Sequence, residues 1–348
     1  MELYIFNQDN RQMAGIIEAY EYLRWTRRYS QCGGFELKAI ANDSNLALLR
    51  LGNVLWKNDD EEAAIIEFVE LTMQEREYIT VSGRFATCFL ARRIVWSTET
   101  LGGDLSAGVA QLLNNHLIAP SDDNRKINGI SYTPVNLGKP INTQISYRNL
   151  MDAVTGLCET ADTGIKTVFN PAVGTFEVIL YAGADSPAVF SKEYENIIEQ
   201  VYTLSKTDHA NTALIGGEGE GSERTFAATG GGSGEGRYEI FVDAKDLRAE
   251  DFPDNYEEAL IFRGDAKLSE QALVQAFDVT VNQYGNLKYK ADFDIGSNIR
   301  AVSKRWGVSM AARITEIEES YDRVGMSLGV TFGKPLLTLS QKLKGGTL

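Results

Sequence analysis

The chain has 348 residues, of which 43% are hydrophobic and 24% charged, and its 48 acidic side chains outnumber its 34 basic ones, for a net charge of −14. This is the composition of a globular protein with room for two or three domains, and it excludes an intrinsically disordered chain. The acidic balance argues against a protein that holds nucleic acid through clustered lysines and arginines.

The cysteines and the N-terminus point to a reducing compartment. Cys32, Cys88 and Cys158 include no CxxC pair, so we expect free buried thiols and neither a disulfide framework nor a zinc site. The first residues, MELYIFNQDNRQ, lack the basic region and long apolar run of a secretory signal. No segment approaches the roughly 18 apolar residues of a membrane span. We therefore expect a soluble protein without membrane insertion.

Residues 1–96 are predicted to be mostly strands. The stretches ELYIF, LRLGNVLWK, AAIIEFVELTM and EYITVSG follow one another at short spacing and are rich in β-branched and aromatic residues. The stretch GRFATCFLARRIV is predicted to be a short helix with Phe85, Cys88 and Phe89 on one side.

Residues 97–190 change character and predict a small α/β region between two β-rich parts. DLSAGVAQLLNNHL and SYRNLMDAVTGLC carry apolar residues at helical spacing, and Ser146 is the expected N-cap of the second helix. KTVFNPAVGTFEVILY predicts two strands around an Asn-Pro/Gly turn.

Residues 191–348 return to strands. LVQAFDVTVNQYG and NLKYKADFDIGSNI are predicted to be two strands that meet at residues 284–286, because Leu287, Tyr289 and Phe293 alternate with charged residues. AARITEIEE and GMSLGVTFG complete a meander, which is typical of an antiparallel barrel or sandwich. Residues 336–348 are expected to form a peripheral strand or an interaction arm.

The glycine-rich stretch Ala213–Gly236 is the most unusual segment of the chain. No lysine follows its glycines as a phosphate-binding loop requires, and no glycine set has dinucleotide-binding spacing. Its glutamates would repel phosphate. We expect a long hairpin between strands, with a turn at Gly216 and Gly217 and a Glu-rich tip that reaches a neighbouring ring component or a central channel.

Little else in the sequence indicates chemistry. His116 is expected at the edge of a core and His209 in solvent, and no metal-ligand spacing occurs. Because carboxylates are plentiful, a glycosidase with paired acids stays an alternative, although the acids alternate with apolar residues as on a solvated sheet face. Trp56, Trp96 and Trp306 lie in apolar strand contexts typical of a core. We predict no catalytic residue, no metal and no cofactor.

Two segments nevertheless resemble a known family, the tail-hub or baseplate-hub proteins of siphophage-type and prophage tails. In FSKEYENIIEQVYTLSKTDHANTALIGGEGEGSERTFAATGG the residues that match the family pattern are Asn196, Ile197, Gly216, Gly217, Gly219, Gly221 and Arg224. The segment YKADFDIGSNIRAVSKRWGVSMAARITEIEESYDRVGMSLGVTFGKP resembles the family's closing meander. The resemblance covers most of the chain and is densest over residues 190–335.

The resemblance implies a mainly β, α+β fold with two antiparallel β-barrels like those of the tail tube and an inserted α/β domain. It divides the chain into a first barrel domain (1–96), the insertion (97–190), return strands that complete the barrel region and carry the glycine-rich hairpin of 213–236 (191–245), and a second barrel with the C-terminal tail (246–348). The candidate loop toward another subunit or the lumen is then Gly216, Gly217, Glu218, Gly219, Glu220, Gly221 and Arg224.

The same resemblance implies a non-enzymatic part of the virion that is made in the cytoplasm of a bacterial host. A homotrimer would join the six-fold tail tube to a three-fold spike or tail tip, in contact with the tube protein, distal-tail or baseplate ring proteins and the tape-measure protein. DNA would pass through an acidic lumen without specific binding. A carbohydrate-active or glycan-binding tail-tip module and another tail ring protein (distal tail or tube) stay open as alternatives.

Overall fold

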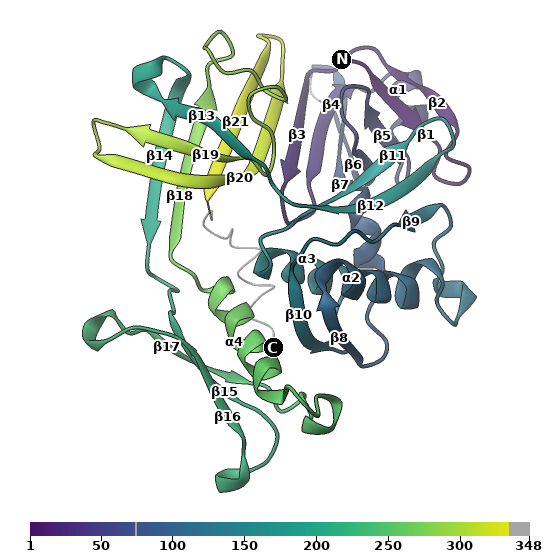
Figure 1. The fold of residues 1–348 in the computed structure, drawn as a ribbon. Coiled ribbons are helices and arrows are strands. Elements are labelled where there is room, and N and C mark those ends of the chain that lie inside the picture. The colour runs from purple at the N-terminus through teal and green to yellow at the C-terminus, as the bar shows by residue number, and fades with distance from the viewer. Residues whose placement is uncertain (74, 334–348) are drawn as a thin grey trace.

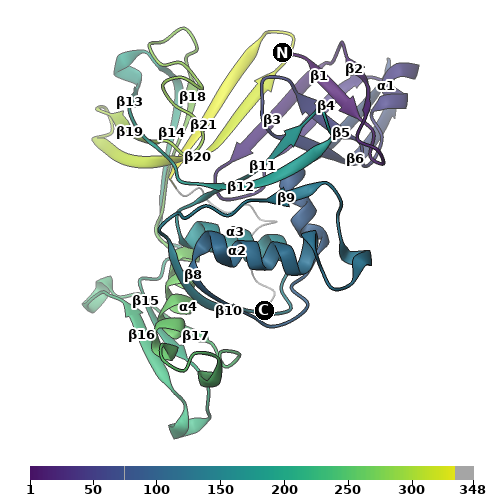
Figure 2. The ribbon, with the colours of Figure 1, turned by 45° about the vertical axis from the view of Figure 1, so that its right-hand side comes forward.

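A computed structural model describes residues 1–73 and 75–333 of the chain. Two β-rich parts lie side by side, and two smaller parts that contain the helices α2 (Leu105–Leu113), α3 (Leu150–Thr160) and α4 (Tyr256–Glu270) lie below them (Figures 1 and 2). A single large sheet runs through both β-rich parts, and three smaller sheets serve the rest. The predicted class, mainly β within α+β, is confirmed. The prediction for residues 336–348 lies outside the described residues.

The N-terminal β unit contains seven antiparallel strands in the order β3-β4-β7-β6-β5-β1-β2. They are β1 (Leu3–Phe6), β2 (Met13–Ile17), β3 (Tyr22–Arg28), β4 (Gly34–Ile40), β5 (Val54–Lys57), β6 (Ala63–Met73) and β7 (Glu77–Phe85), with α1 (Asp43–Leu48) between β4 and β5. The alternating residues of these strands bury one face around Trp25, Phe35 and Phe85. The predicted strands here are confirmed, and the predicted helix after them is a 3₁₀-helix, Ala86–Arg92.

The C-terminal β unit continues the same sheet with strands from the second half of the chain. They are β13 (Asp185–Ser191), β14 (Ile197–Ser205), β18 (Val274–Val281), β19 (Asn298–Ser303), β20 (Val308–Tyr321) and β21 (Met326–Gly333). The first half of β20 pairs with β19, its second half pairs with β3, and β21 runs along its other edge. Phe190, Phe277 and Phe332 lie at the centre of this unit's core. The β20–β3 ladder therefore joins the two units.

Neither β unit is closed into a barrel by its ladders. In the part of the chain that the structure describes, β13 and β14 do not pair with each other, and neither do β2 and β3. The sheet is open at both ends, so the predicted barrel form is not seen in the hydrogen-bond pattern.

The predicted strand over 286–299 is wrong. Residues 288–293 fold back on themselves, because Asp292 N donates to Lys288 O (2.8 Å) and Lys290 N donates to Phe293 O (2.8 Å), while Lys290 has a positive φ of 64°. Tyr289 and Phe293 still pack together, with ring centroids 5.8 Å apart. The alternating apolar residues therefore reach the core from a turn and not from a strand. Strand β18, which was expected to pair with residues 286–299, has β14 and β21 as its neighbours.

The α/β unit lies below the N-terminal β unit. Its strands form a two-stranded sheet, β10-β8, and a three-stranded sheet, β11-β12-β9. Its elements are β8 (Glu99–Asp104), α2 (Leu105–Leu113), a π-helical turn (Asn114–Ile118), a 3₁₀ turn (Asp123–Arg125), β9 (Ile130–Tyr132), β10 (Pro140–Ile145), α3 (Leu150–Thr160), β11 (Gly164–Asn170) and β12 (Thr175–Tyr181). Both predicted helices and the predicted hairpin are confirmed.

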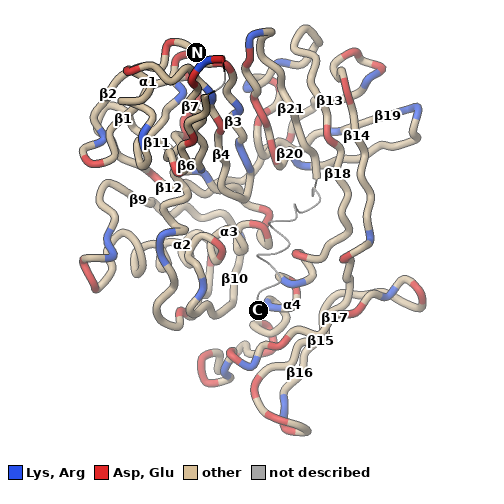
Figure 3. The backbone as a smooth tube through the Cα atoms, turned by 180° about the vertical axis from the view of Figure 1, so that it is seen from behind, with Lys and Arg blue, Asp and Glu red and all other residues tan. Residues whose placement is uncertain are grey.

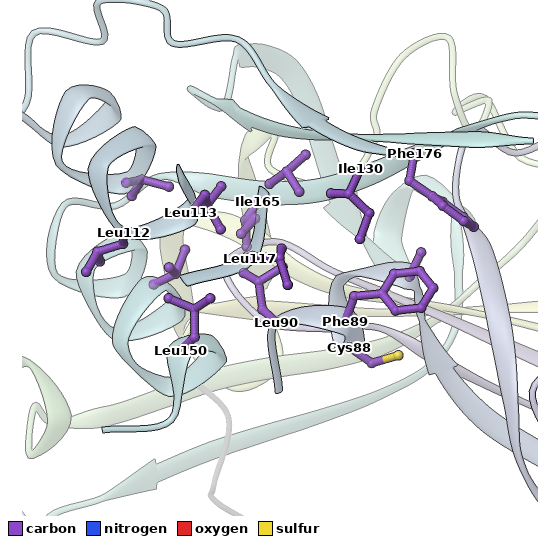
Figure 4. Packing of buried hydrophobic residues seen from close by; sticks show 14 of the residues in the cluster. Cys88, Phe89, Leu90, Leu112, Leu113, Leu117, Ile130, Leu150, Ile165 and Phe176 are labelled. Atoms are coloured by element: carbon purple, nitrogen blue, oxygen red, sulfur yellow. The ribbon is translucent and has the colours of Figure 1, made fainter. Parts of the chain in front are cut away.

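The start of α3 differs from its prediction. Asn149 is the N-cap, since its side chain accepts from Met151 N (3.0 Å) and Asp152 N (3.4 Å). Ser146 cannot serve because Tyr147, with a positive φ of 52°, separates it from the helix. The helix then buries Leu150 with Leu112, Leu113 and Ile165 in one core, which Figure 4 shows. That core also contains residues of the N-terminal β unit, so the two share one hydrophobic cluster.

The small unit, residues 206–272, hangs below the C-terminal β unit (Figure 1). It consists of the sheet β16-β15-β17 and one helix. The elements are β15 (Thr212–Gly216), β16 (Phe226–Gly230), β17 (Glu239–Asp243) and α4 (Tyr256–Glu270), with 3₁₀ turns at Gly221–Glu223, Gly234–Gly236 and Ala249–Asp251. Helix α4, which the sequence analysis did not predict, buries only Ala259, Leu260 and Gly264, too narrow an apolar stripe to show as periodicity.

Candidate assembly interface

The candidate loop lies within the small unit and is folded onto it. Gly216 ends β15, and Gly217 N still donates to Thr225 O (2.8 Å), so the ladder continues past the predicted turn position. The turn lies at 219–224 instead. Residues 231–238 form a second connection, which crosses the end of β15 and is held by Asn211. The glycine-rich stretch is therefore two loops around a short strand.

Arg224 holds the first loop in place. Its guanidinium donates to Gly217 O (3.0 Å) and Gly216 O (2.6 Å) and pairs with Asp243 on β17. A Cβ at Gly216 would lie 2.6 Å from the guanidinium carbon, and one at Gly217 would lie 2.4 Å from Tyr256 Oη. A larger residue at either position would have to displace the Arg224 guanidinium or the Tyr256 hydroxyl group from its hydrogen bonds.

The acidic residues of the loop have different surroundings. Glu218 is tied down, since its N donates to Tyr256 Oη (2.7 Å) and its carboxylate accepts from Ala249 N (2.8 Å). Gly219 and Gly221 have positive φ values of 100° and 56°, which shape the turn between them. Glu220 and Gly221 are exposed at its tip. Within residues 216–224, this tip is the part most open to another molecule, since Gly216 and Gly217 are buried.

The junction of the two β units is a second site, and one that the sequence analysis missed. Lys57 is completely buried, and its ammonium lies 2.7 Å from Glu319 and 2.8 Å from Asp59. Glu319 also accepts from Tyr289 Oη (2.9 Å) and Tyr321 Oη (2.6 Å). Burial alone would lower the pKa of Lys57, but its two carboxylate partners raise it overall.

A second buried cation, Arg27 on β3, extends this network. It donates to Asp294 (2.6 Å) and to Tyr289 Oη (3.0 Å), and its Nε lies 3.6 Å from Asp60. Next to them, burial and the charge of Asp60 raise the pKa of Glu62 to about 8. Strands β3, β5 and β20 thus meet through paired buried charges, which fixes one arrangement of the two units.

The two units together form a continuous antiparallel run of eight strands with free ends. The order is β14-β18-β21-β20-β3-β4-β7-β6, and Figure 3 shows these strands side by side. At one end, among the described residues, β14 pairs only with β18, and it exposes Ile198, Val201 and Leu204. At the other end, the second half of β6 has β7 as its one ladder partner within residues 1–73 and 75–333, and it exposes Phe68 and Leu71. Unpaired edges of this length are surfaces for another strand.

The face of this run that points away from the cores is polar and mixed in charge. It is rich in hydroxyl side chains, namely Thr26, Thr80, Ser82, Thr203, Thr280, Ser320, Ser327 and Thr331. Its charged residues are Arg24, Arg28, Lys38, Arg84, Glu36, Glu70, Glu199, Asp278, Glu316 and Glu318. Arg28 pairs with Glu316 (2.7 Å) and Arg24 with Glu318 (3.5 Å). The acidic surplus of the chain is therefore small on this face.

The small unit holds that surplus instead. Residues 206–272 contain fifteen acidic and seven basic residues, a net charge of −8 out of −14. Figure 3 shows acidic positions on the loops at its tips.

The residues weighed for catalysis do not form a site. His116 is buried with Nε2 3.1 Å from Glu99, and burial lowers its pKa. His209 contacts Tyr238 and the carbonyl of Gln271. Burial raises the pKa of Cys88 to about 12. The described residues contain no group of three or more His, Cys, Asp or Glu side chains placed to hold a metal ion, and no described helix is long and apolar enough to cross a membrane.

A family model for the Siphovirus ReqiPepy6 Gp37-like protein matches residues 2–334, nearly the whole chain. The chain belongs to this family. No curated protein matches the sequence of this Gp37-like chain significantly.

The Gp37-like chain also shares its fold with solved tail proteins. The 43 kDa tail protein of prophage MuSo2 from Shewanella oneidensis matches with a TM-score of 0.62 at 12% identity, over 96% of this chain and 99% of its own. Prophage tail protein gp18 from Listeria monocytogenes EGD-e matches with 0.62 at 10% identity, over 99% of both chains. A chain of the Francisella PdpA–VgrG complex matches with 0.52 at 8% identity, over 97% of this chain and 53% of its own. The similarity to tail hubs seen in the sequence is thus confirmed at the level of family and fold.

Proposed function

We propose that this Gp37-like protein is a structural, non-enzymatic hub subunit of a phage or prophage tail, located in the virion at the tail tip or baseplate. Its family and its fold support a tail role. The observation that carries the hub assignment is the eight-stranded run with free edges at β14 and at the second half of β6, beyond the residues that pair with β5.

The free edges support a ring. Pairing β14 of one copy with the outer half of β6 of the next is a head-to-tail contact, and such contacts close into a ring when the rotation permits. Each copy brings two β units with separate cores, each of which contributes four strands to the run, and we propose that these units act as the two tube-like barrels. Three copies then present six units to a six-fold tail tube and keep three-fold symmetry toward a spike or tip.

The polar face supports passage through the ring. We propose that the hydroxyl-rich face of the run lines the lumen, where DNA and the tape-measure protein pass without specific binding. Paired charges such as Arg28 and Glu316 offer no free cluster of cations to phosphate. The candidate loop at 216–224 then faces a neighbouring tube, distal-tail, baseplate or tip protein rather than the lumen, because it lies in the small unit below the sheet.

The proposed division of the chain keeps the two β units and the α/β insertion. Its boundary at 245 is best moved to about residue 272, since one hydrophobic cluster joins β15, β17 and α4. The expected core positions of the tryptophans hold only for Trp56, which is half-buried against a core, because Trp96 and Trp306 are exposed to 57% and 47%. A glycan-binding role still has less support, since these two exposed rings lie far apart in the chain, Trp96 just before β8 and Trp306 between β19 and β20. A six-fold ring, as in a tube or distal-tail protein, is the other outcome that the following test separates.

The test is the oligomeric state and symmetry of the full chain. Sedimentation velocity should show a particle of three chains, and electron microscopy a three-fold ring. Val201→Lys places a charge on the β14 edge and should yield monomers, whereas Tyr284→Lys, at a residue that is 99% exposed, should leave the ring intact. A six-fold ring, or a trimer that Val201→Lys does not weaken, would contradict the proposal.

A further inference from the structure

The outer face of the small sheet is apolar although none of the residues in 1–73 and 75–333 covers it. Helix α4 packs on the other face, where Ala213, Ile215 and Val242 are buried. On the outer face, cross-strand register sets Leu214 beside Ala228 and Phe241, and Gly216 beside Phe226 and Asp243. Leu214, Phe226 and Phe241 are exposed to 47%, 51% and 56%. A short sheet that is apolar on both faces is typical of a buried layer, and here one face is open.

Arg224 gives this face a fixed shape. Its guanidinium carbon lies 5.8 Å from the ring centroid of Phe226 and 5.4 Å from that of Phe241, over the space that Gly216 leaves free. The side chain is only 13% exposed, and its charge is matched by Asp243 and two carbonyls. The face therefore exposes two aromatic rings that pack against Arg224, and one leucine. The positive charge of Arg224 is already paired and is not available to a partner.

The charge around the face selects the partner. The unit carries −8; exposed Glu239 lies two residues before Phe241 on β17 and therefore on the same face, and Glu220 and Glu223 are exposed in the turn that joins β15 to β16. Two such faces would repel each other, so a second copy of this chain is disfavoured. We infer that this face, formed by Leu214, Phe226, Ala228 and Phe241, docks a different polypeptide whose apolar side chains are flanked by lysines or arginines, as on one side of a basic amphipathic helix.

This inference deepens the proposed hub role, since it names the chemistry of a neighbour, but it does not depend on ring closure. The ring uses the edges of β14 and β6, and docking uses a sheet face on another part of the chain. Val201→Lys should therefore leave docking unchanged, and the face variants should leave the oligomeric state unchanged.

The test uses the full chain and a defined probe, a fluorescent helical peptide of leucines and lysines about 18 residues long, or five turns. A leucine–glutamate peptide of the same length is its control. Anisotropy should show binding of the lysine peptide that is at least about tenfold tighter than that of the glutamate peptide, and binding should weaken as salt rises.

The variant Phe226→Ser/Phe241→Ser keeps every charge and should weaken binding of the lysine peptide at least about tenfold. The matched control, Phe68→Ser, alters a phenylalanine of similar exposure, 50%, in the N-terminal β unit and should leave binding unchanged. The single variant Phe241→Ser, expected to weaken binding at least about threefold, provides the same comparison should the double variant fold poorly.

Three outcomes would overturn the inference. Equal binding by the face variant would show attraction by charge alone. Dissociation of an oligomer of the chain by Phe226→Ser/Phe241→Ser would make the occupant a second copy. Binding of an N-acetylglucosamine tetrasaccharide that these substitutions abolish, without peptide binding, would make the face a glycan site.

Discussion

The junction of the two β units and the outer face of the small unit treat charged and aromatic residues in opposite ways. At the junction Lys57, Arg27 and Glu319 are buried and paired. In the small unit two aromatic rings are half exposed, and the unit carries a net charge of −8. Buried pairs select one arrangement within a chain, whereas the exposed apolar face has no partner among the residues that the structure describes. The junction therefore stabilises the arrangement of the two β units within the chain, whereas the outer face of the small unit is a candidate surface for binding another protein.

Lys57→Met should have the largest effect on stability, because it leaves Glu319 buried without its cation. Removing one partner of a buried pair costs about 3–5 kcal/mol of unfolding free energy, measurable by urea titration. Arg248→Met is the control, since its pair with Glu250 has side chains 66% and 72% exposed. The double variant Lys57→Met/Glu319→Gln should recover part of the loss, and equal effects of Lys57→Met and the control would refute the assignment.

Glu62→Gln should change how stability depends on pH. The pKa of Glu62 is about 8 in the folded chain against 4.5 as its ordinary value, so its stabilising effect is full below pH 4.5 and is lost as pH rises through 8. Relative to the variant, the natural chain should lose about 2–4 kcal/mol between pH 5 and 8.5, at about 1.4 kcal/mol for each pKa unit. Urea midpoints across that range would measure it. Parallel curves for the two proteins would mean that Glu62 is ionised when folded.

Gly217→Ala tests the inner side of the small unit. The new Cβ would meet Tyr256 Oη at 2.4 Å and Leu260 at about 3 Å, so the loop must shift from α4. Such overpacking costs about 1–3 kcal/mol, and hydrogen exchange should rise in residues 212–260 but not at the β3–β20 ladder. Gly231→Ala, whose Cβ meets nothing, is the control. Protection that falls equally in both regions would show that the unit does not loosen alone.

Phe226→Ser/Phe241→Ser should have the smallest effect on stability. Both rings are about half exposed, and substitutions at the surface usually change unfolding free energy by less than about 0.5 kcal/mol. Urea titration should therefore detect little, while docking of the basic peptide is lost. A clear loss of stability would mean that the face belongs to the unit's own fold, and the contrast with the junction would disappear.

Much of the local structure could be predicted from sequence. Helix α2 and the β11–β12 hairpin follow from periodicity and turn residues, and β20 and β21 from alternation. The segment 286–299 shows the limit, because alternation in Leu287, Tyr289 and Phe293 serves a turn as well as a strand when both bury the same rings. Helix α4 was missed because a helix that packs through Ala259 and Gly264 needs no broad apolar face.

The candidate loop was found by its glycines, but their purpose was not. The space that a side chain at Gly216 or Gly217 would occupy is filled by Arg224 and Tyr256. Arg224 lies in the following turn and Tyr256 begins α4, and the positions of glycines in the sequence do not predict these contacts. Lys57 and Glu319 show the same limit, since they lie 262 residues apart in sequence and meet only because β3 pairs with β20.

The sequence by itself determined that this chain is mainly β, acidic overall and similar to tail hubs, because composition, period and ordered short motifs are local properties of the chain. The tertiary structure alone decided which charges are buried in pairs, which strand edges stay free and which apolar face stays open. Those properties depend on contacts between residues far apart in sequence. The type of residue does not fix its environment: a lysine can be buried in an ion pair between two units, and a phenylalanine can be exposed to solvent.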